Sequence, residues 1–574
     1  MSADSLVFDM SSMSEGTSSV FVRKDWVSIL DNQNQNYQGN QSTIDTSQLS
    51  NSNKYFNYRE AYITCPLLLT LTQSVGSNAL WIPATANGSA SPDYIMGLRN
   101  WYGSIVHSMT VDYNGTTIVQ QTPYCGLWNT FKLMTSLSYE DVLLNGASMG
   151  FWPDDVSGFE LSQVASTQGI ANCVTNNKNL GAFPVVANAF NTFNAYNEGL
   201  LQRQQGWNFD PDGVTGGTQT YANLLTTNNL NLLWKSYVFR KIDATGGPPS
   251  LTPGVCQVAI TAQIYLKHLH SFFERVPLLK GVFLKLTLNL NQSSVSFTIN
   301  AGGEFTTCSV QSPLGGVSPI MIASTGAGQG SVDLVEGAYT ASISVGKACL
   351  NATQASLALV GQSPLGSSIL LNIPAYTFNP TFEASYLSSP IKKVVYSDIY
   401  QYQIVNQLTG GQTFNQLITN GISNIKSVLV LPFYSSGSNG GLSPIQSPFE
   451  PAGGGPTSPL CLLTQFQIQI SGTNAIYNTE RYSYEQYLNQ LAGANSINGN
   501  LTDGLTSSLV SQKDFEMGYC YYYVNCGRML PVEEMVPKSV NILGTNLNSK
   551  GIDLFVFVEY GVEVSLNILT GARV

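Results

Sequence analysis

Two histidines separated by one residue are the side chains whose types and spacing best suit metal chemistry. The run from His268 to Gly281 reads H-x-H-x3-E-x6-G. On a strand the imidazoles of His268 and His270 would share one face, and Glu274 would add a carboxylate. Three ligands of these types could bind zinc or iron weakly. The alternative is that both histidines are packed or hydrogen-bonded beside other residues of the strand.

The same run resembles the first metal motif of the cupins, whose fold is also a jelly roll. The family's leading glycine falls at Ala262, however, and its second motif needs a later histidine, which this chain lacks after His270. We therefore predict no metal site, no cofactor and no catalytic residue, with His268, His270 and Glu274 as weak metal candidates only. A cupin-like metal-dependent enzyme remains an alternative.

Other motifs match catalytic or ligand-binding patterns only in part. Gly146–Gly150 fits G-x-S-x-G, but a helix precedes it where the nucleophile elbow needs a strand, so we interpret it as a helix C-cap followed by a turn. Asn208–Gly213 has an imperfect calcium-loop pattern, for which an Asx-type turn is the simpler explanation. The adjacent acids at 154–155 and 533–534 are expected to be solvated.

Composition indicates a surface suited to packing against protein. Charged residues make up 10% of the 574, against about 25% in ordinary soluble proteins, while the hydrophobic share is 43%. Uncharged residues take the place of the missing charged ones, and they include 48 asparagines and 52 glycines. A neutral group costs less to desolvate than an unpaired ion. The net charge of −10 argues against direct, sequence-specific binding of nucleic acid.

The chain carries no pattern of a secreted or membrane-spanning protein. No apolar run approaches the 18 or so residues of a membrane helix, and we expect neither a transmembrane segment nor secretion. The nine cysteines are scattered and include no C-x-x-C pair. We therefore expect reduced thiols.

Periodicity predicts an all-β protein with few, short helices. From Phe283 to Asn291 every second residue is leucine, which is the period of a half-buried strand. The segment Val562–Ile568 alternates in the same way, and Leu554–Val558 is continuously apolar, as in a strand buried on both faces. His107 falls on an apolar strand face and is expected to be a core or partner contact.

A strand, a hairpin and a capped helix occur twice in the chain. The first hairpin turns at Asn114-Gly115, and a helix opens at Ser138 and ends at Gly146. The second turns at Gly472, and its helix opens at Ser483. Each helix has a hydroxyl at its N-cap and an acid or amide three residues later. The recurrence, 345 residues apart from Ser138 to Ser483, predicts two copies of one all-β unit.

Composition also suggests where these units begin and end. Residues 1–19 are expected to form an N-terminal arm, 20–385 a first unit and 386–574 a second unit. The first unit is expected to hold insertions at about 151–235 and 302–368. The first stretch lacks strong periodicity and carries Asn, Gly and Gln clusters, and the second is rich in Gly and Ser with short apolar strands.

An ordered set of segments resembles the double jelly-roll major capsid proteins of virophages and Polinton-like viruses, small icosahedral DNA viruses related to the large nucleocytoplasmic DNA viruses. The set comprises Leu269–Gly281, the stretch from Pro374–Pro380 to Tyr400–Tyr402, Phe414–Gly421 and Pro448–Pro451. The resemblance covers most of 20–145 and 255–574. It agrees with the internal duplication, which was found from the residues alone.

This resemblance implies two tandem eight-stranded jelly-roll β-barrels with a few short helices and long loop insertions. It also implies homotrimeric, pseudo-hexameric capsomers that tile an icosahedral virion shell, with penton and minor capsid proteins as further partners. Synthesis would take place in the host cytoplasm or a viral factory. The family is structural and supplies no catalytic residues. A glycan-binding β-sandwich, such as a receptor-binding virion component, remains the second alternative.

Overall fold

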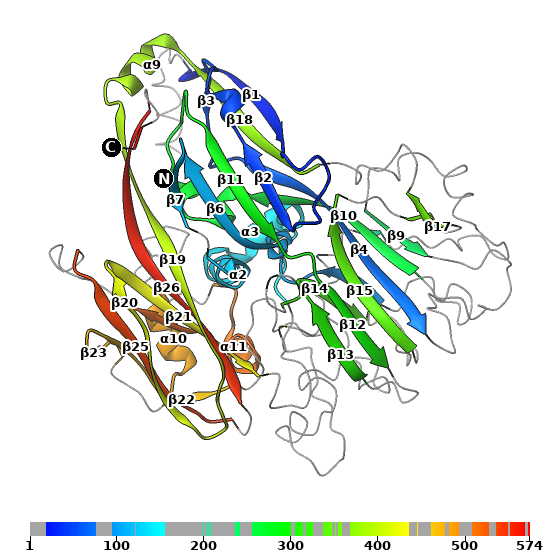
Figure 1. Ribbon diagram of the computed structural model, residues 1–574. Helices are drawn as coiled ribbons and strands as arrows, with labels where there is room; N and C mark the ends of the chain where they lie inside the picture. The colour runs from blue at the N-terminus through cyan, green and yellow to red at the C-terminus, as the bar shows by residue number, and fades with distance from the viewer. Residues whose placement is uncertain are drawn as a thin grey trace, which may run out of the picture.

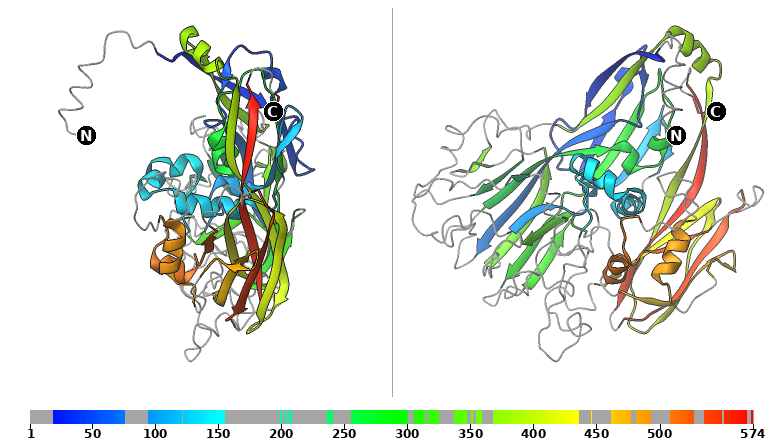
Figure 2. Two further views of the ribbon diagram at one scale, coloured as in Figure 1. Left: turned by 90° about the vertical axis from the view of Figure 1, so that its left-hand side faces the viewer. Right: turned by 180° about the vertical axis from the view of Figure 1, so that it is seen from behind.

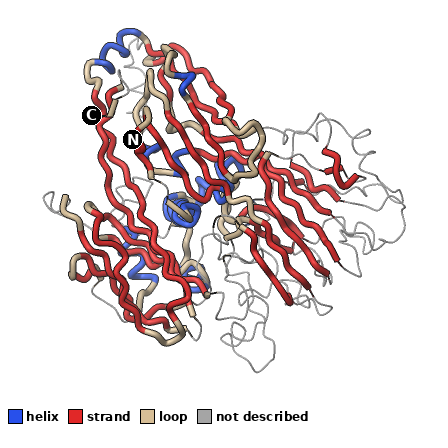
Figure 3. Tube along the Cα trace, viewed as in Figure 1, coloured by secondary structure: helices blue, strands red, loops and turns tan. Residues whose placement is uncertain are grey.

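The computed structural model describes most of the chain, with gaps in the loops. The described residues are 19–75, 94–120, 122–154, 199, 203, 206–207, 236–240, 255–299, 305–312, 314, 317–324, 337–346, 350–351, 354–358, 368–435, 445, 461–476, 481–492, 508–526, 535–548, 551–568 and 572–573. The expected arm at 1–19 and most of the expected insertion at 151–235 lie outside them. Strands dominate the described chain, and helices gather in a few places (Figure 3).

The predicted strand patterns are confirmed. The leucine alternation forms β11, Leu284–Leu290, whose four leucines are buried while Lys285 is exposed. The C-terminal alternation belongs to β26, Ile552–Asn567, in which residues 552–559 are buried on both faces. Period-two apolar residues thus fix which face of each strand turns to the core.

Roll 1 is a sandwich of two antiparallel sheets from the first two thirds of the chain (Figure 1). Its eight strands, lettered B to I in chain order, pair as B-I-D-G and C-H-E-F. The first sheet holds β1 (Phe21–Leu30), β18 (Leu370–Phe378), β4 (Tyr62–Val75) and β10 (Val255–Tyr265). The second sheet holds β2 (Gln41–Asp45), β11, β6 (Val106–Tyr113) and β7 (Thr116–Val119). This is the strand order of a jelly roll.

Roll 2 repeats the same order with shorter connections. Its B-I-D-G sheet holds β19 (Ile391–Leu408), β26, β21 (Ile425–Tyr434) and β24 (Tyr522–Asn525). Its C-H-E-F sheet holds β20 (Thr413–Ile422), β25 (Lys538–Asn546), β22 (Leu463–Ile470) and β23 (Thr473–Asn474). The chain is therefore two tandem jelly rolls, as the sequence predicts.

Further strands widen roll 1 beyond its eight. Those joined to its B-I-D-G sheet are β3 (Tyr55–Phe56), β8 (Gly206–Trp207), β9 (Ser236–Arg240), β12 (Ser294–Ile299), β13 (Phe305–Gln311) and β15 (Gly337–Val345). Two separate ribbons pair β5 (Tyr94–Leu98) with β14 (Ile320–Ser324), and β16 (Leu350–Asn351) with β17 (Gln354–Ala358). β15 pairs with the second half of β4, beyond the part that β18 covers.

Helices occupy the connections between strands. They are α2 (Cys125–Ser136), α3 (Tyr139–Met149), α7 (Leu266–Leu269), α8 (Phe272–Arg275), α9 (Pro380–Leu387), α10 (Tyr484–Ala492), α11 (Gln512–Met517), and the 3-10 turns η1 (Ser47–Leu49) and η2 (Tyr102–Ile105). Seen edge-on, α2 and α3 of roll 1 and α10 and α11 of roll 2 project from the same side of the sheets (Figure 2).

The duplicated helix is α3 in roll 1 and α10 in roll 2. Each follows the E–F hairpin, and each opens with a reciprocal capping box, Ser138 with Asp141 and Ser483 with Gln486. The predicted end of the first helix is wrong by one turn. The helix runs on to Met149 and ends at Gly150, which adopts φ +58°.

The link between the rolls is anchored on roll 1. Helix α9 has its N-cap at Asn379 and Pro380 at its first position, which suits a missing backbone N–H. The Glu383 carboxylate accepts a hydrogen bond from the Tyr55 hydroxyl at 2.8 Å and pairs with Lys280 Nζ at 3.2 Å. From α9 the chain enters β19, and the long β19–β26 ribbon runs from beside roll 1 into roll 2 (Figure 1).

We predict that Gly150→Ala destabilises the protein far more than Gly115→Ala. Both glycines have φ between +58° and +82°, so both substitutions strain the backbone by about 1 kcal/mol. A Cβ at Gly150 would also lie 2.3 Å from the buried Tyr102 ring, whereas a Cβ at Gly115 meets nothing within 4 Å. Urea unfolding of both variants measures the difference, and equal losses would contradict this account.

Candidate functional site

The two candidate metal histidines do not share a strand face. Strand β10 ends at Tyr265, and Leu266–Leu269 form the short helix α7, so the strand predicted there is wrong. Leu266 and Leu269 are both buried, which is the i, i+3 spacing of a helix that packs on one side. His270 lies just after α7 and has an extended backbone, with φ −157° and ψ 140°, so the helix ends between the two histidines and their side chains meet different neighbours.

His268 is enclosed by aromatic rings of roll 1. Its ring meets Tyr265 edge-on at 5.6 Å and Trp101 at 6.4 Å. Burial, assisted by the nearby Lys267 charge, lowers the pKa of His268 to about 3. The imidazole is therefore neutral near pH 7 and packs among these aromatic rings.

His270 instead joins the two rolls. Its Nδ1 accepts a hydrogen bond from the Phe272 backbone N–H at 3.1 Å, so Nε2 carries the proton and donates to Asp398 Oδ1 of β19 at 3.2 Å. Glu274, the third candidate, is half-buried, and burial raises its pKa although Lys132 and other cations oppose the shift. Within the described ranges, no three or more His, Cys, Asp or Glu side chains gather in a way that could hold a metal.

The remaining motifs form no reactive arrangement in the part of the chain that the structure describes. Ser148 of the G-x-S-x-G pattern lies in the last turn of α3, where its hydroxyl donates to the Asn145 carbonyl at 2.8 Å. The acids 533–534 and the calcium-like loop 208–213 lie outside the described residues. Five cysteines of the described chain are free thiols, namely Cys65, Cys125, Cys461, Cys520 and Cys526. None of the described helices is long and apolar enough to span a membrane.

Asp154 is buried, so the prediction of a solvated acid is wrong at this position. Its Oδ1 lies 2.7 Å from Arg203 Nη2, with both side chains at most 3% exposed. Arg203 Nε donates to the Leu98 carbonyl at 3.3 Å, and the Tyr519 hydroxyl of roll 2 donates to the Asp154 carbonyl at 2.7 Å. The sequence carries no signal for this cluster, because its partners come from three distant segments.

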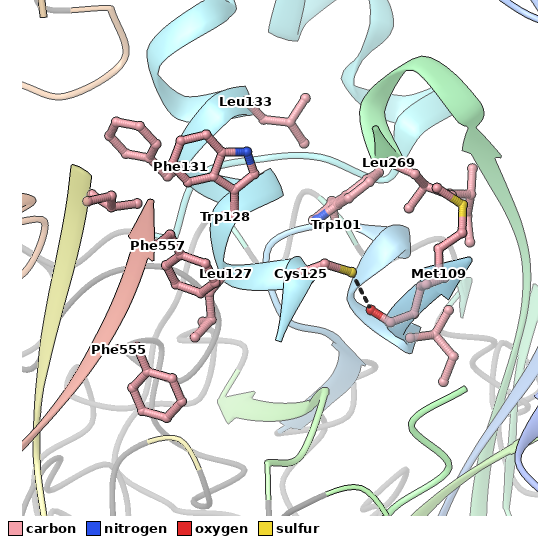
Figure 4. Close-up of a cluster of buried hydrophobic side chains, with 14 of the residues drawn as sticks. Trp101, Met109, Cys125, Leu127, Trp128, Phe131, Leu133, Leu269, Phe555 and Phe557 are labelled. Carbon is pink, nitrogen blue, oxygen red and sulfur yellow. Dashed lines mark hydrogen bonds between the residues drawn. The ribbon is translucent and has the colours of Figure 1, made fainter. Parts of the chain in front are cut away.

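Helix α2, which the sequence analysis missed, makes an aromatic contact between the rolls. The ring centroid of Trp128 lies 6.2 Å from that of Phe557 in β26 (Figure 4). The ring of Phe131 lies 5.1 Å from the rings of both Tyr521 and Tyr523. Tyr124, just before α2, meets Phe555 edge-on at 5.1 Å. The spacing of Leu127, Trp128, Phe131 and Met134 was the available signal, since it marks one apolar side of a helix.

Hydrogen bonds surround this aromatic contact. The Thr122 hydroxyl donates to the Ile399 carbonyl at 2.9 Å, and the Tyr396 hydroxyl donates to the Ile118 carbonyl. The Ser271 hydroxyl accepts from the Ser397 N–H at 3.0 Å and donates to the Ser397 carbonyl. Partly buried backbone groups of β19 thus find hydrogen-bond partners on roll 1.

One charged group completes the junction. Glu559 of β26 is buried and accepts a hydrogen bond from the Ser427 hydroxyl at 2.6 Å. Burial alone would raise the pKa of Glu559, but Lys132 of α2, Ser427 and other groups outweigh burial and hold the pKa below its ordinary value. The carboxylate therefore stays ionised and attracts α2 across the junction.

The contacts at this junction hold the two rolls together. Burying a large apolar side chain stabilises by roughly 1.5–3 kcal/mol, and several aromatic residues are buried on each side. An aromatic pair adds about 0.5–1.5 kcal/mol beyond its area. The rolls are therefore held as one body. The class of protein that this arrangement defines is a double jelly roll.

Comparisons with known proteins place similar chains among viral capsid proteins. No protein-family model and no curated protein matches the sequence. A chain in the cryo-EM structure of the Sputnik virophage has 10% sequence identity to this protein. The match covers 97% of this chain and 89% of that chain, with a TM-score of 0.46. The mavirus major capsid protein is 10% identical, covering 97% and 91%, with a TM-score of 0.43. The Faustovirus major capsid protein is 9% identical, covering 96% and 92%, with a TM-score of 0.39. The fold assignment rests on the strand order of the two rolls.

We predict that Arg203→Met lowers the free energy of unfolding by about 3 kcal/mol or more, because it leaves the Asp154 carboxylate buried without its cation. The matched control is Arg481→Met, since Arg481 pairs with Glu516 at 3.9 Å and both side chains are about half exposed or more. Its loss should stay below about 1 kcal/mol. Urea unfolding measures both, and similar losses would show that the buried pair is not needed.

We also predict that stability falls between pH 7 and pH 5. Burial lowers the pKa of His107 to about 4, and burial with Lys267 lowers that of His268 to about 3, whereas an unfolded histidine titrates near 6.5. Below pH 6.5 only the unfolded state gains protons, so each histidine should cost about 2 kcal/mol by pH 5. Unfolding at both pH values should show a smaller decrease in the His107→Gln, His268→Gln double variant. An unchanged decrease would rule out these two groups.

Proposed function

We propose that this chain is a major capsid protein of the double jelly-roll type found in virophages and Polinton-like viruses. It assembles into homotrimeric, pseudo-hexameric capsomers that tile an icosahedral virion shell, and it is made in the host cytoplasm or a viral factory. Penton and minor capsid proteins are its further partners. The observation that carries the proposal is the repetition of one jelly roll, B-I-D-G against C-H-E-F, across a buried junction.

Repetition within one chain has a direct use in a shell. Three copies present six similar rolls, so a threefold assembly has nearly hexagonal outlines and packs into a flat lattice. The low charge of the chain, 10% of residues, reduces the cost of burying its flanks against neighbours. Many modest contacts then become stable together.

We propose the domain boundaries that the composition of the chain predicts. Residues 1–19 form the arm, 20–385 form the first jelly roll with insertions at about 151–235 and 302–368, and 386–574 form the second. The division at 385–386 falls in the last turns of α9, between β18 and β19. No catalytic residue, cofactor or metal is assigned.

We predict that the purified full chain associates into a discrete species of about 186 kDa, three times the 62.0 kDa of one chain. Light scattering during size separation measures this mass, and negative-stain images of the same peak should show hexagonal outlines or closed shells. A chain that stays at 62.0 kDa at every concentration and salt tested would contradict the proposed function.

A further inference from the structure

Four cations gather around one carboxylate where the end of β10 meets helices α2, α7 and α8. Burial raises the pKa of Glu274 in α8, and the charges that oppose this shift are those of Lys132, Arg275, Arg59 and Lys267. Arg59 and Arg275 are exposed, and the other three side chains are half-buried. These four cations form a positive corner of roll 1 in a chain whose net charge is −10.

Strand pairing and helix packing bring the positive corner together from separate segments. Tyr265, the last residue of β10, pairs with Tyr62, the first residue of β4. Lys267 follows two residues after Tyr265, and its Nζ lies 5.6 Å from the centre of the Tyr265 ring. Arg59 comes three residues before Tyr62, and helix α2, which carries Lys132, contacts α7. The positive corner is thus built on the frame of the sheet.

The acids nearby leave most of the positive corner open to a ligand. Glu60, which follows Arg59 in the sequence, pairs with Lys24 Nζ at 2.5 Å. Lys132 also acts on Glu559 across the junction, so we count the other three cations as available. Within the described residues, none of the four cations lies in an ion pair. Like charges repel one another, and an anionic group bound among them is attracted by each.

A row of aromatic rings continues from the positive corner to the edge of the sheet. The ring of Tyr265 lies 5.7 Å from that of Tyr62, which lies 5.6 Å from that of Trp26 in β1. Trp26 is 52% exposed, and Lys24 Nζ lies 5.5 Å from the centre of its ring. Cations and aromatic rings therefore adjoin at both ends of this aromatic row.

Adjoining cations and aromatic rings are complementary to single-stranded nucleic acid. Lys and Arg attract its phosphates, and its unpaired bases stack on aromatic rings with little regard to sequence. An acidic polypeptide would use only the cations, and a duplex keeps its bases stacked on one another. Charges farther apart than about 8 Å are largely screened at physiological salt, so the acids elsewhere on the chain do not cancel the positive corner.

We infer that the positive corner and the aromatic row form one surface that binds single-stranded nucleic acid without sequence preference. Phosphates lie among Arg59, Lys267 and Arg275, and a base stacks on Trp26. These contacts read no base edges, which agrees with the expectation that the chain does not bind nucleic acid sequence-specifically. The inference goes beyond the proposed capsid role and does not depend on it.

Binding of a fluorescent oligothymidylate of about 12 nucleotides to the full chain, measured by anisotropy, tests this surface. Each phosphate neutralised on a single strand contributes about −0.7 to the slope of log K against log salt, so three cations predict a slope of about −2. The Arg59→Gln, Arg275→Gln double variant should reduce the slope to about −0.7. The matched double variant Lys285→Gln, Lys513→Gln removes the same charge at exposed sites elsewhere and should not change the slope.

Two further substitutions separate the aromatic and electrostatic contributions. Trp26→Leu should weaken binding at least about fivefold, whereas Trp26→Tyr keeps an aromatic ring and should stay within about twofold of the unchanged chain. Glu274→Gln removes the negative charge within the positive corner and should tighten binding about threefold. Glu485→Gln makes the same change at an exposed site of α10 and should leave binding unchanged. Thermal unfolding by circular dichroism checks that each variant folds.

Several results would contradict the inference. They are an absence of binding at low salt, a slope that the double arginine variant leaves unchanged, and tighter binding of a duplex of equal length. Full competition by polyglutamate, together with unchanged binding by Trp26→Leu, would assign the cations to an acidic polypeptide and also overturn it. None of these outcomes bears on the proposed function, which the mass of the assembled chain tests separately.

Discussion

The packing of helix α2 against roll 2 is the contact on which the rest of the structure depends. Trp128 and Phe131 reach from the E–F side of roll 1 to the outer sheet face of roll 2, where Tyr523 and Phe557 would otherwise meet water. Hydrogen bonds from Thr122 and the Lys132 charge act around the same contact. Because interiors are close-packed, this contact fixes the angle between two otherwise separate sandwiches.

Features set by nearby residues were predictable from the sequence. The alternation in Leu284–Leu290 determines the buried face of β11 without reference to any partner, because the period of a strand is local. The capping boxes at Ser138 and Ser483 are also local, and their recurrence after two hairpins revealed the duplication. The duplication in turn predicted the two rolls, which the strand order confirms.

Features set by distant residues were not predictable. Asp154 is buried because Arg203 and Tyr519 reach it from other parts of the chain, and neither leaves a trace beside Asp154 in the sequence. Around His268, the assumption of a continuing strand concealed the helical spacing of Leu266 and Leu269. A weak local pattern there yields to tertiary packing, and the apparent metal pair separates into a core residue and a link to Asp398.

The α9 connection has a consequence for stoichiometry. A short helix held to roll 1 by Glu383 keeps roll 2 at a high effective concentration beside it, so the two rolls meet without a bimolecular search. Two separate proteins with these surfaces would have to be produced in equal amounts and sorted into alternating positions. One translated chain supplies them in equal number and in fixed alternation, and the two rolls are free to diverge without losing their order.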